Sequence, residues 1–209
     1  MLLTATVSST HIEAIRKTLN IEKANFEIIQ STNLLYQEIR YEVVSKKERK
    51  DTIIGEMAEM IRTIEDGKSI IYCARKKDCE EIRDILQTKL PNYLLDIYHG
   101  GLDSKDKKHV LEKWEENKTY TIIATTAFGM GLNIPDVRLI LHYTFLTTLI
   151  ELIQLSGRAG HDGKPAKDVI FFGLKDLRTN YSIIAKDQRY NNIYYKLYIL
   201  NIQNYINYI

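Results

Sequence analysis

Short β-rich runs alternate along the chain with longer segments in which apolar residues recur at helical spacing. Several of the runs are apolar nearly throughout, as strands buried on both faces of a parallel sheet are. This alternation predicts an α/β fold, a doubly wound and mostly parallel sheet with helices on both faces. The expected strands are Ile39 to Val44, Ser69 to Cys73, Leu94 to Tyr98, Thr121 to Thr125, Val137 to Tyr143 and Asp168 to Phe172.

The segments between these runs carry the helix signals. Thr10 and Glu13 form a capping-box pair at the start of an N-terminal helix. Asp103 is the expected cap of a later helix, in which the spacing of Trp114 predicts core packing. Apolar residues recur at helical spacing at Ile53, Met57, Met60, Ile61 and Ile64, and again at Cys79, Ile82, Leu86 and Leu90.

Composition limits the classes of partner. The 29 basic and 27 acidic residues give a formal net charge of +2, so any contact with nucleic acid must come from a local group of side chains. Cys73 and Cys79 lie in an expected strand and helix, which predicts reduced thiols in an intracellular protein. Two cysteines cannot complete a four-thiolate zinc site. No apolar run approaches the roughly 20 residues that span a bilayer, so no membrane contact is expected.

The pattern divides the chain into three regions. In residues 1–30, Met1 to Thr6 has the pattern of a strand end and its exit turn, with no earlier strand to pair with, followed by a helix. Residues 31–175 hold the predicted sheet. Residues 176–209 form a helical extension rich in Tyr, Asn and Ile, most regular from Tyr194 to Ile209. We therefore expect the chain to be part of something larger.

One candidate site is the segment from Gln154 to Gly163, which follows a helical pattern. Its glycines Gly157, Gly160 and Gly163 allow the backbone to approach a ligand closely. Arg158 between them can present a planar fork of donors to phosphate oxygens, as a sensor of a γ-phosphate would. The other interpretation is a glycine-rich surface turn with a solvated arginine, and these residues alone leave both open.

A second candidate is the loop after the expected strand at Thr121 to Thr125. Ligands of open α/β sheets bind at the carboxyl ends of strands, where this loop begins. Thr125 and Thr126 can donate hydroxyl hydrogen bonds to a phosphate, and Asn133 can reach a sugar hydroxyl. Gly129 and Gly131 permit close backbone approach. The alternative is an ordinary turn before Pro135.

Taken together, these segments resemble a known family. Ala124 to Asn133, then His142, then Gln154 to Gly160 are similar in order and spacing to the fifth and sixth helicase motifs of the RecQ family of superfamily 2 DNA helicases. Upstream, Ser69 to Cys73 and Tyr98 to Leu102 resemble the fourth motif and the Tyr-His-x-Gly-Leu element of that family. The start, Leu3-Thr4-Ala5-Thr6, resembles the third motif, which in the family ends the first motor lobe.

The resemblance implies the second RecA-like motor lobe of an ATP-dependent 3′-to-5′ DNA helicase. Its implied partners are single-stranded and duplex DNA and a first motor lobe, and that first lobe would hold most of the ATP and Mg²⁺. A nuclear location would follow in a eukaryote, with roles in DNA repair and recombination, and a cytoplasmic one otherwise. Carried over by position, the nucleotide site comprises Arg158, Gln154, Asn133, Gly129, Gly131 and Gly157, and the DNA contacts are Thr125, Thr126 and Arg75.

The chain departs from the family pattern at three positions. His161 stands where the family has a second arginine, the expected finger on the γ-phosphate. Histidine lacks the guanidinium fork and is mostly neutral at pH 7. Because an arginine finger contributes 10³-fold or more to turnover, hydrolysis is expected to suffer. Ile134 replaces a common lysine, and Leu146 replaces the usual proline.

Other expected parts are missing from the sequence. It contains no Gly-x-x-x-x-Gly-Lys-[Ser/Thr] phosphate loop and no Asp-Glu-x-His element, so the chain alone is not expected to assemble the ATP site. Its end resembles the helix that leads into the zinc module of RecQ proteins, without the cysteines of that module. Two other interpretations stay open, a non-catalytic nucleic-acid-binding or regulatory module and the lobe of a DEAD-box RNA helicase.

Overall fold

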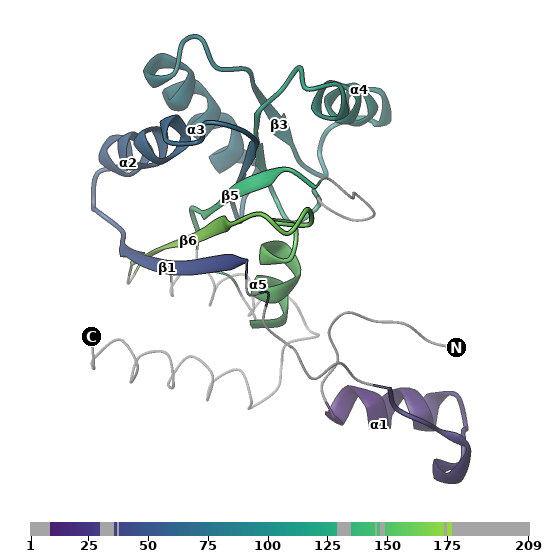
Figure 1. The fold of residues 1–209 in the computed structure, drawn as a ribbon. Coiled ribbons are helices and arrows are strands. Elements are labelled where there is room, and N and C mark those ends of the chain that lie inside the picture. The colour runs from purple at the N-terminus through teal and green to yellow at the C-terminus, as the bar shows by residue number, and fades with distance from the viewer. Residues whose placement is uncertain are drawn as a thin grey trace.

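The computed structural model describes residues 9–29, 36, 38–128, 135–144, 146, 149–173 and 175–176. Figure 1 shows the arrangement of the elements, with the helices stacked around a central sheet. In chain order the elements are α1 (Ser9–Thr18), the 3-10 helix η1 (Lys23–Asn25), β1 (Ile39–Ser45), α2 (Lys50–Arg62), β2 (Lys68–Tyr72), α3 (Lys76–Lys89), β3 (Leu95–Tyr98), α4 (Ser104–Glu115), β4 (Thr121–Ala124), β5 (Val137–His142), α5 (Leu149–Ser156) and β6 (Ala166–Phe172).

The six strands form one sheet in the order β1-β6-β5-β2-β4-β3, and every neighbouring pair is parallel. The predicted α/β class and all of the expected strands are confirmed, with strand ends that differ from the prediction by one or two residues. Because the strands are parallel, all of their carboxyl ends meet at one edge of the sheet. That edge holds the exits of β2 and β4, from which part of the candidate site is built.

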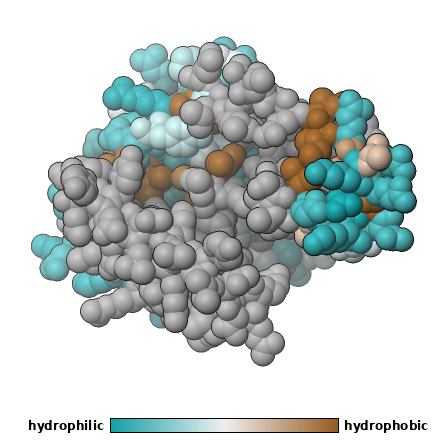
Figure 2. Space-filling model, turned by 90° about the horizontal axis from the view of Figure 1, so that it is seen from below, coloured by the Kyte–Doolittle hydropathy of each residue, from teal (hydrophilic) through white to brown (hydrophobic). Residues whose placement is uncertain are grey.

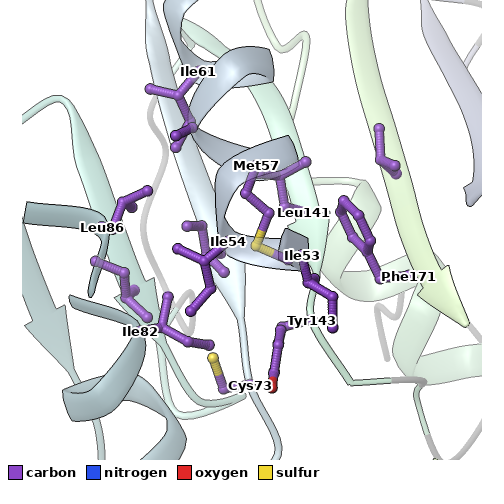
Figure 3. Close-up of a cluster of buried hydrophobic side chains, with 14 of the residues drawn as sticks. Ile53, Ile54, Met57, Ile61, Cys73, Ile82, Leu86, Leu141, Tyr143 and Phe171 are labelled. Carbon is purple, nitrogen blue, oxygen red and sulfur yellow. The ribbon is translucent and has the colours of Figure 1, made fainter. Parts of the chain in front are cut away.

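Two hydrophobic cores lie on opposite faces of the sheet because successive residues of a strand point to opposite faces. The α2/α3 core contains Ile71 and Cys73, whereas the α4/α5 core contains Ile70 and Tyr72. Figure 3 shows the first of these cores, where α2 and α3 pack against the middle of the sheet. Its labelled side chains are Ile53, Ile54, Met57, Ile61, Cys73, Ile82, Leu86, Leu141, Tyr143 and Phe171.

Several local predictions are confirmed. The Asp103 carboxylate accepts a hydrogen bond from the Asp106 backbone N–H at 2.7 Å and caps α4. Trp114 is fully buried in the α4/α5 core. Cys73 and Cys79 are buried free thiols, with Cys79 in the first turns of α3. Burial raises the pKa of the Cys73 thiol well above its ordinary value, which keeps it protonated.

The predicted cap of the first helix is wrong. Helix α1 begins at Ser9, so Thr10 lies inside the helix rather than at its N-cap position. Glu13 instead accepts hydrogen bonds from the guanidinium of Arg16, one turn later. In Figure 1, α1 lies apart from the sheet, beyond α5. Figure 2 shows this segment on the right, where hydrophobic residues lie beside hydrophilic ones.

Some predictions fall outside the described residues. These are the strand end at Met1 to Thr6, the motif at Leu3 to Thr6 and the helical pattern from Tyr194 to Ile209. The described sheet runs from Ile39 to Phe172, and the domain limits at residues 30 and 175 remain predictions.

Candidate nucleotide and nucleic-acid site

The carboxyl edge of the sheet brings together the three residues predicted to contact DNA. Arg75 follows β2, while Thr125 and Thr126 follow β4, and these two strands are neighbours. Backbone hydrogen bonds fix both exits, since the Cys73 N–H donates to the Ala124 carbonyl at 2.8 Å and the Thr125 N–H donates to the Tyr98 carbonyl at 3.1 Å. The three side chains therefore share one edge.

Arg75 is held in a defined orientation at this edge. It occupies the N-cap position of α3, and its Nε and Nη2 each donate a hydrogen bond of 2.8 Å to the carboxylate of Asp78. These hydrogen bonds raise the pKa of Arg75 above its ordinary value. The Asp78 side chain is only 4% exposed, whereas that of Arg75 is 64% exposed. A buried carboxylate thus orients a guanidinium that still faces solvent, where it could meet a phosphate.

Lys46 also reaches this edge but is already engaged. Its Nζ lies 2.8 Å from Oδ1 of Asp176, donates to the Tyr143 carbonyl and sits 4.0 Å from the centroid of the Tyr143 ring. Sequence reasoning did not single out Lys46, since its partners are far away in the chain. Because these contacts occupy its charge, Lys46 is a weaker candidate for a phosphate contact than Arg75.

The loop after β4 starts from an anchored position. The Phe128 N–H donates to the Thr125 carbonyl at 3.0 Å, which makes a turn, and Thr126 is exposed on it. Phe128 itself is buried, with its ring 5.1 Å from that of Tyr98 and 5.9 Å from that of Trp114. The predicted residues Gly129, Gly131 and Asn133, together with Ile134, lie outside the described residues.

The segment after α5 forms a tight turn whose glycines are required by its geometry. Gly160 has a φ of +71°, and a Cβ there would lie 2.8 Å from the side chain of Glu38. A Cβ on Gly157 would lie 3.0 Å from the Ile153 carbonyl. The Gly160 N–H donates to the Val137 carbonyl at 3.1 Å, which ties the turn to the start of β5. Arg158 is therefore carried by a rigid turn and is partly buried rather than solvated.

His161 and Gln154 are exposed, whereas Arg158 is partly buried. The turn that carries His161 is fixed by Asp162, which pairs with Arg138 of β5 and accepts a hydrogen bond from the Lys164 N–H at 3.1 Å. The Arg138 hydrogen bond holds the pKa of the Asp162 carboxyl below its ordinary value. The position predicted for the second arginine is thus well anchored even though it carries histidine.

A buried polar pair lies between the neighbouring strands β5 and β6. His142 Nε2 lies 3.1 Å from Asp168 Oδ2, and both side chains are completely buried. The ring of Tyr72 stacks on His142 with centroids 5.7 Å apart. Burial raises the pKa of Tyr72, and the positive charge of Arg158 partly offsets this rise. The Tyr72 hydroxyl also donates to the Phe128 carbonyl, in the loop after β4, at 3.5 Å.

The predicted convergence of the two segments stays a prediction, because residues 129–134 lie outside the described part of the chain. Phe128, the residue before the glycine-containing loop, shares the α4/α5 core with Leu155 and Ala159, which flank Arg158 in sequence. Leu146, which replaces the usual proline, packs against the same core. The DNA-contact candidates lie at the carboxyl edge, whereas Arg158 lies on the turn after α5, which the Gly160 N–H ties to the first residue of β5 at the amino end of the sheet.

The model of the helicase conserved C-terminal domain family matches residues 48–163, more than half of the chain. The chain belongs to this family.

Curated relatives of this helicase lobe are named as ATP-dependent helicases. It is 31% identical over 187 residues to the putative ATP-dependent DNA helicase Q1 of Caenorhabditis briggsae and 33% identical over 189 residues to the ATP-dependent helicase SGS1 of Saccharomyces cerevisiae, with 89% of the chain covered in each case. The match spans 29% of the length of the first protein and 12% of the second. These relatives confirm the resemblance, so the chain carries the helicase C-terminal lobe of a RecQ-family protein.

A solved structure confirms the RecA-like fold of this lobe. S. cerevisiae Dbp5 bound to RNA and ADP BeF3 superimposes with a TM-score of 0.69 at 21% identity, over 91% of this chain and 48% of that one. At this identity the likeness concerns the fold alone.

Sequence reasoning missed two residues of this helicase lobe that the structure places at its centre. Tyr72 lay within a recognised motif without an assigned role, and Asp168 was taken only as the start of a strand. An acidic residue in an otherwise apolar strand was the available signal, because a buried carboxylate requires a partner. Within the described residues no helix has the length and apolar character of a membrane span, and no group of three metal-ligating side chains occurs.

Proposed function

We propose that this chain is the second motor lobe of an ATP-dependent 3′-to-5′ DNA helicase of RecQ type, which completes the ATP site and grips the DNA backbone. The observation that carries the proposal is the placement of Arg75, Thr125 and Thr126 at one sheet edge, in a lobe whose Arg158 is carried by the hydrogen-bonded turn after α5. The unwinding direction and the choice of DNA rest on the family resemblance. For a eukaryotic source, the proposal extends to a nuclear location and to DNA repair and recombination.

The grip on DNA would be directed at phosphates. Threonine hydroxyls and backbone N–H groups bind phosphate oxygens, and such contacts position a strand without reading its sequence. Arg75 adds a positive charge that Asp78 already orients, so little conformational entropy is lost when a phosphate binds. We therefore expect binding to single-stranded DNA with no sequence preference and with a clear dependence on salt.

The ATP site would be shared between two lobes. From this lobe, Arg158 would bind the terminal phosphates and Gln154 and Gly157 would line the site, together with Gly129, Gly131 and Asn133. A guanidinium suits an anionic phosphate, and bound ATP with Mg²⁺ would supply the free energy for movement. Closure of the lobes around ATP and reopening after hydrolysis would alternate the grip on the strand.

The second candidate function is a nucleic-acid-binding or regulatory lobe that has lost hydrolysis. His161 favours it, because this residue sits on a turn that Asp162 and Arg138 keep in place. The turn is thus held in place, while histidine lacks the guanidinium fork that would stabilise the transition state.

A fusion of this lobe to a matching RecQ first lobe tests the proposal through its DNA-stimulated ATPase. Stimulated turnover that falls at least tenfold in Arg158→Ala supports the motor function. Lys118→Ala, at an exposed lysine between α4 and β4 to which the proposal gives no role, is the control and should retain full activity. Absence of stimulation, followed by recovery in His161→Arg, would select the regulatory alternative. Absence in both proteins would contradict a nucleotide role for this turn.

The isolated chain tests the DNA grip separately. Filter binding of single-stranded DNA at two salt concentrations should give an affinity that falls with salt. Arg75→Ala should weaken binding and reduce the salt slope by about one, the contribution of a single phosphate contact. An unchanged slope in Arg75→Ala would remove this residue from the proposed interface.

A further inference from the structure

A cavity of about 400 Å³ opens at the amino end of the sheet. Its walls come from the loops that lead into β2, β3 and β4, and the residues that matter here are Ile64, Glu65, Asp66, Tyr93, Leu94 and Tyr120. Strand β2 is five residues long, and a strand rises about 3.3 Å per residue. The cavity therefore lies on the order of 15 Å from the carboxyl edge where DNA binding is proposed.

The cavity is formed by fixed loops. The Tyr120 N–H donates to the Leu94 carbonyl at 3.1 Å, and the Ser69 N–H donates to the Tyr120 carbonyl at 2.8 Å. Gln87 Nε2 donates to the Tyr93 carbonyl at 3.4 Å. Gly67 has a φ of +125°, and a Cβ there would lie 2.5 Å from the side chain of Arg138. Because the walls are held by backbone contacts, a ligand would meet a preformed site, which lowers the entropic cost of binding.

The walls combine exposed apolar surface with acidic charge. Leu94 and Tyr120 are 52% and 44% exposed, which is high for large hydrophobic residues in a folded domain. Glu65 is exposed at the rim of the cavity. The Asp66 carboxylate, 91% exposed, lies 3.8 Å from Lys164, a distance and exposure at which the charge is largely screened. The cavity thus has an apolar wall beside two carboxylates available to a cation.

We propose that this cavity docks a segment of a partner protein that presents an arginine or lysine next to a large apolar side chain. The apolar side chain would cover Leu94 and Tyr120, and the cation would pair with Glu65 and Asp66, with the tyrosine rings adding a cation–π contribution. The charge complementarity selects a basic segment over an acidic one. Since the cavity is remote from the carboxyl edge, the partner could remain bound while that edge holds nucleic acid.

The test is a titration of the ¹⁵N-labelled chain with two short peptides, followed by NMR. The probes are acetyl-Leu-Arg-Leu-amide and its matched acidic counterpart, acetyl-Leu-Glu-Leu-amide. The basic peptide is expected to shift the amide signals of Gly67, Asn92, Leu94 and Tyr120, whereas the acidic peptide is expected to leave them in place. Loss of binding at high salt would support the ionic component.

Three variants sharpen the test. Glu65→Gln should weaken binding of the basic peptide about two- to fivefold, the range of an exposed ion pair. Leu94→Ser should weaken it about fivefold through lost apolar contact. Leu19→Ser, at a similarly exposed leucine just after α1, is the matched control and should leave binding unchanged.

Several outcomes would overturn the proposal. These are the absence of shifts at millimolar peptide, equal binding of the acidic peptide, and equal effects of Leu94→Ser and Leu19→Ser. Sedimentation of the chain alone tests whether a second copy of this chain occupies the cavity instead. Self-association that Leu94→Ser abolishes would assign the cavity to a second copy of this chain and would also overturn the proposal. None of these results depends on ATPase activity or DNA binding, so the proposed motor function is judged separately.

Discussion

Replacement of Asp168 by alanine is expected to destabilise the lobe strongly, because it leaves His142 without its hydrogen-bond partner inside the sheet. Both side chains are fully buried, and Nε2 of His142 lies 3.1 Å from each carboxylate oxygen of Asp168. A buried polar group left unsatisfied costs about 1–3 kcal/mol, and removal of one member of a buried charged pair costs about 3–5 kcal/mol. We therefore expect Asp168→Ala to lower the free energy of unfolding by about 3 kcal/mol, the value at which the two ranges meet.

Urea unfolding followed by circular dichroism measures this loss. Thermal unfolding gives a second readout. For a chain of this size, a loss of 1 kcal/mol lowers Tm by about 2–4 °C, so the expected fall in Tm is roughly 6–12 °C. The double variant His142→Leu/Asp168→Val removes both polar groups and should recover most of the loss, since an apolar replacement of a buried pair is often neutral. A loss below about 1 kcal/mol in Asp168→Ala, or strictly additive losses in the double variant, would refute the reasoning.

Three further predictions concern stability. Trp114→Ala should cost about 3–5 kcal/mol by opening a cavity in the α4/α5 core, measured by the urea midpoint at constant m-value. Gly160→Ala should cost more than about 1 kcal/mol in the same assay, since its φ is +71° and a Cβ would meet Glu38 at 2.8 Å. Gly163→Ala is the control, because its φ is +76° but its Cβ would meet nothing. The difference between the two losses measures the steric clash, and the loss in Gly163→Ala measures the backbone strain. The folded pKa of Asp162 lies below its unfolded value because of Arg138, so its stabilisation is present above the unfolded pKa and lost as the pH falls through the folded pKa. Thermal melts between pH 6 and pH 2 should therefore show a smaller acid-induced loss in Arg138→Gln, and identical pH profiles would contradict this assignment.

The strands were predictable because burial on both faces leaves a continuous apolar run in the sequence. The Asp103 cap was predictable for a different reason, since its partner is only three residues away. Local spacing could also have revealed the Arg75–Asp78 pair, at positions i and i+3 of a helix start. In each case the feature depends either on burial of an apolar run or on a partner a few residues away in the sequence.

The remaining features depend on partners far away in the chain. Nothing near Asp168 identifies His142 as the residue that satisfies its carboxylate. Likewise, the cavity beside Leu94 arises from three loops that the parallel topology gathers at one edge. The predicted first-helix cap failed because a capping-box pattern at Thr10 also fits the first turn of a helix that starts one residue earlier.

The pairing of β1 with β6 has a consequence for biosynthesis. Ile39, near the start of the sheet in sequence, lies opposite Ala166, near its end. The ribosome must therefore release almost the whole lobe before its first strand can find a neighbour, and such non-local pairing slows folding. Until then the edge of β5 that β6 later covers stays open to other chains. We expect nascent chains halted before residue 166 to be especially prone to aggregation and to need chaperones.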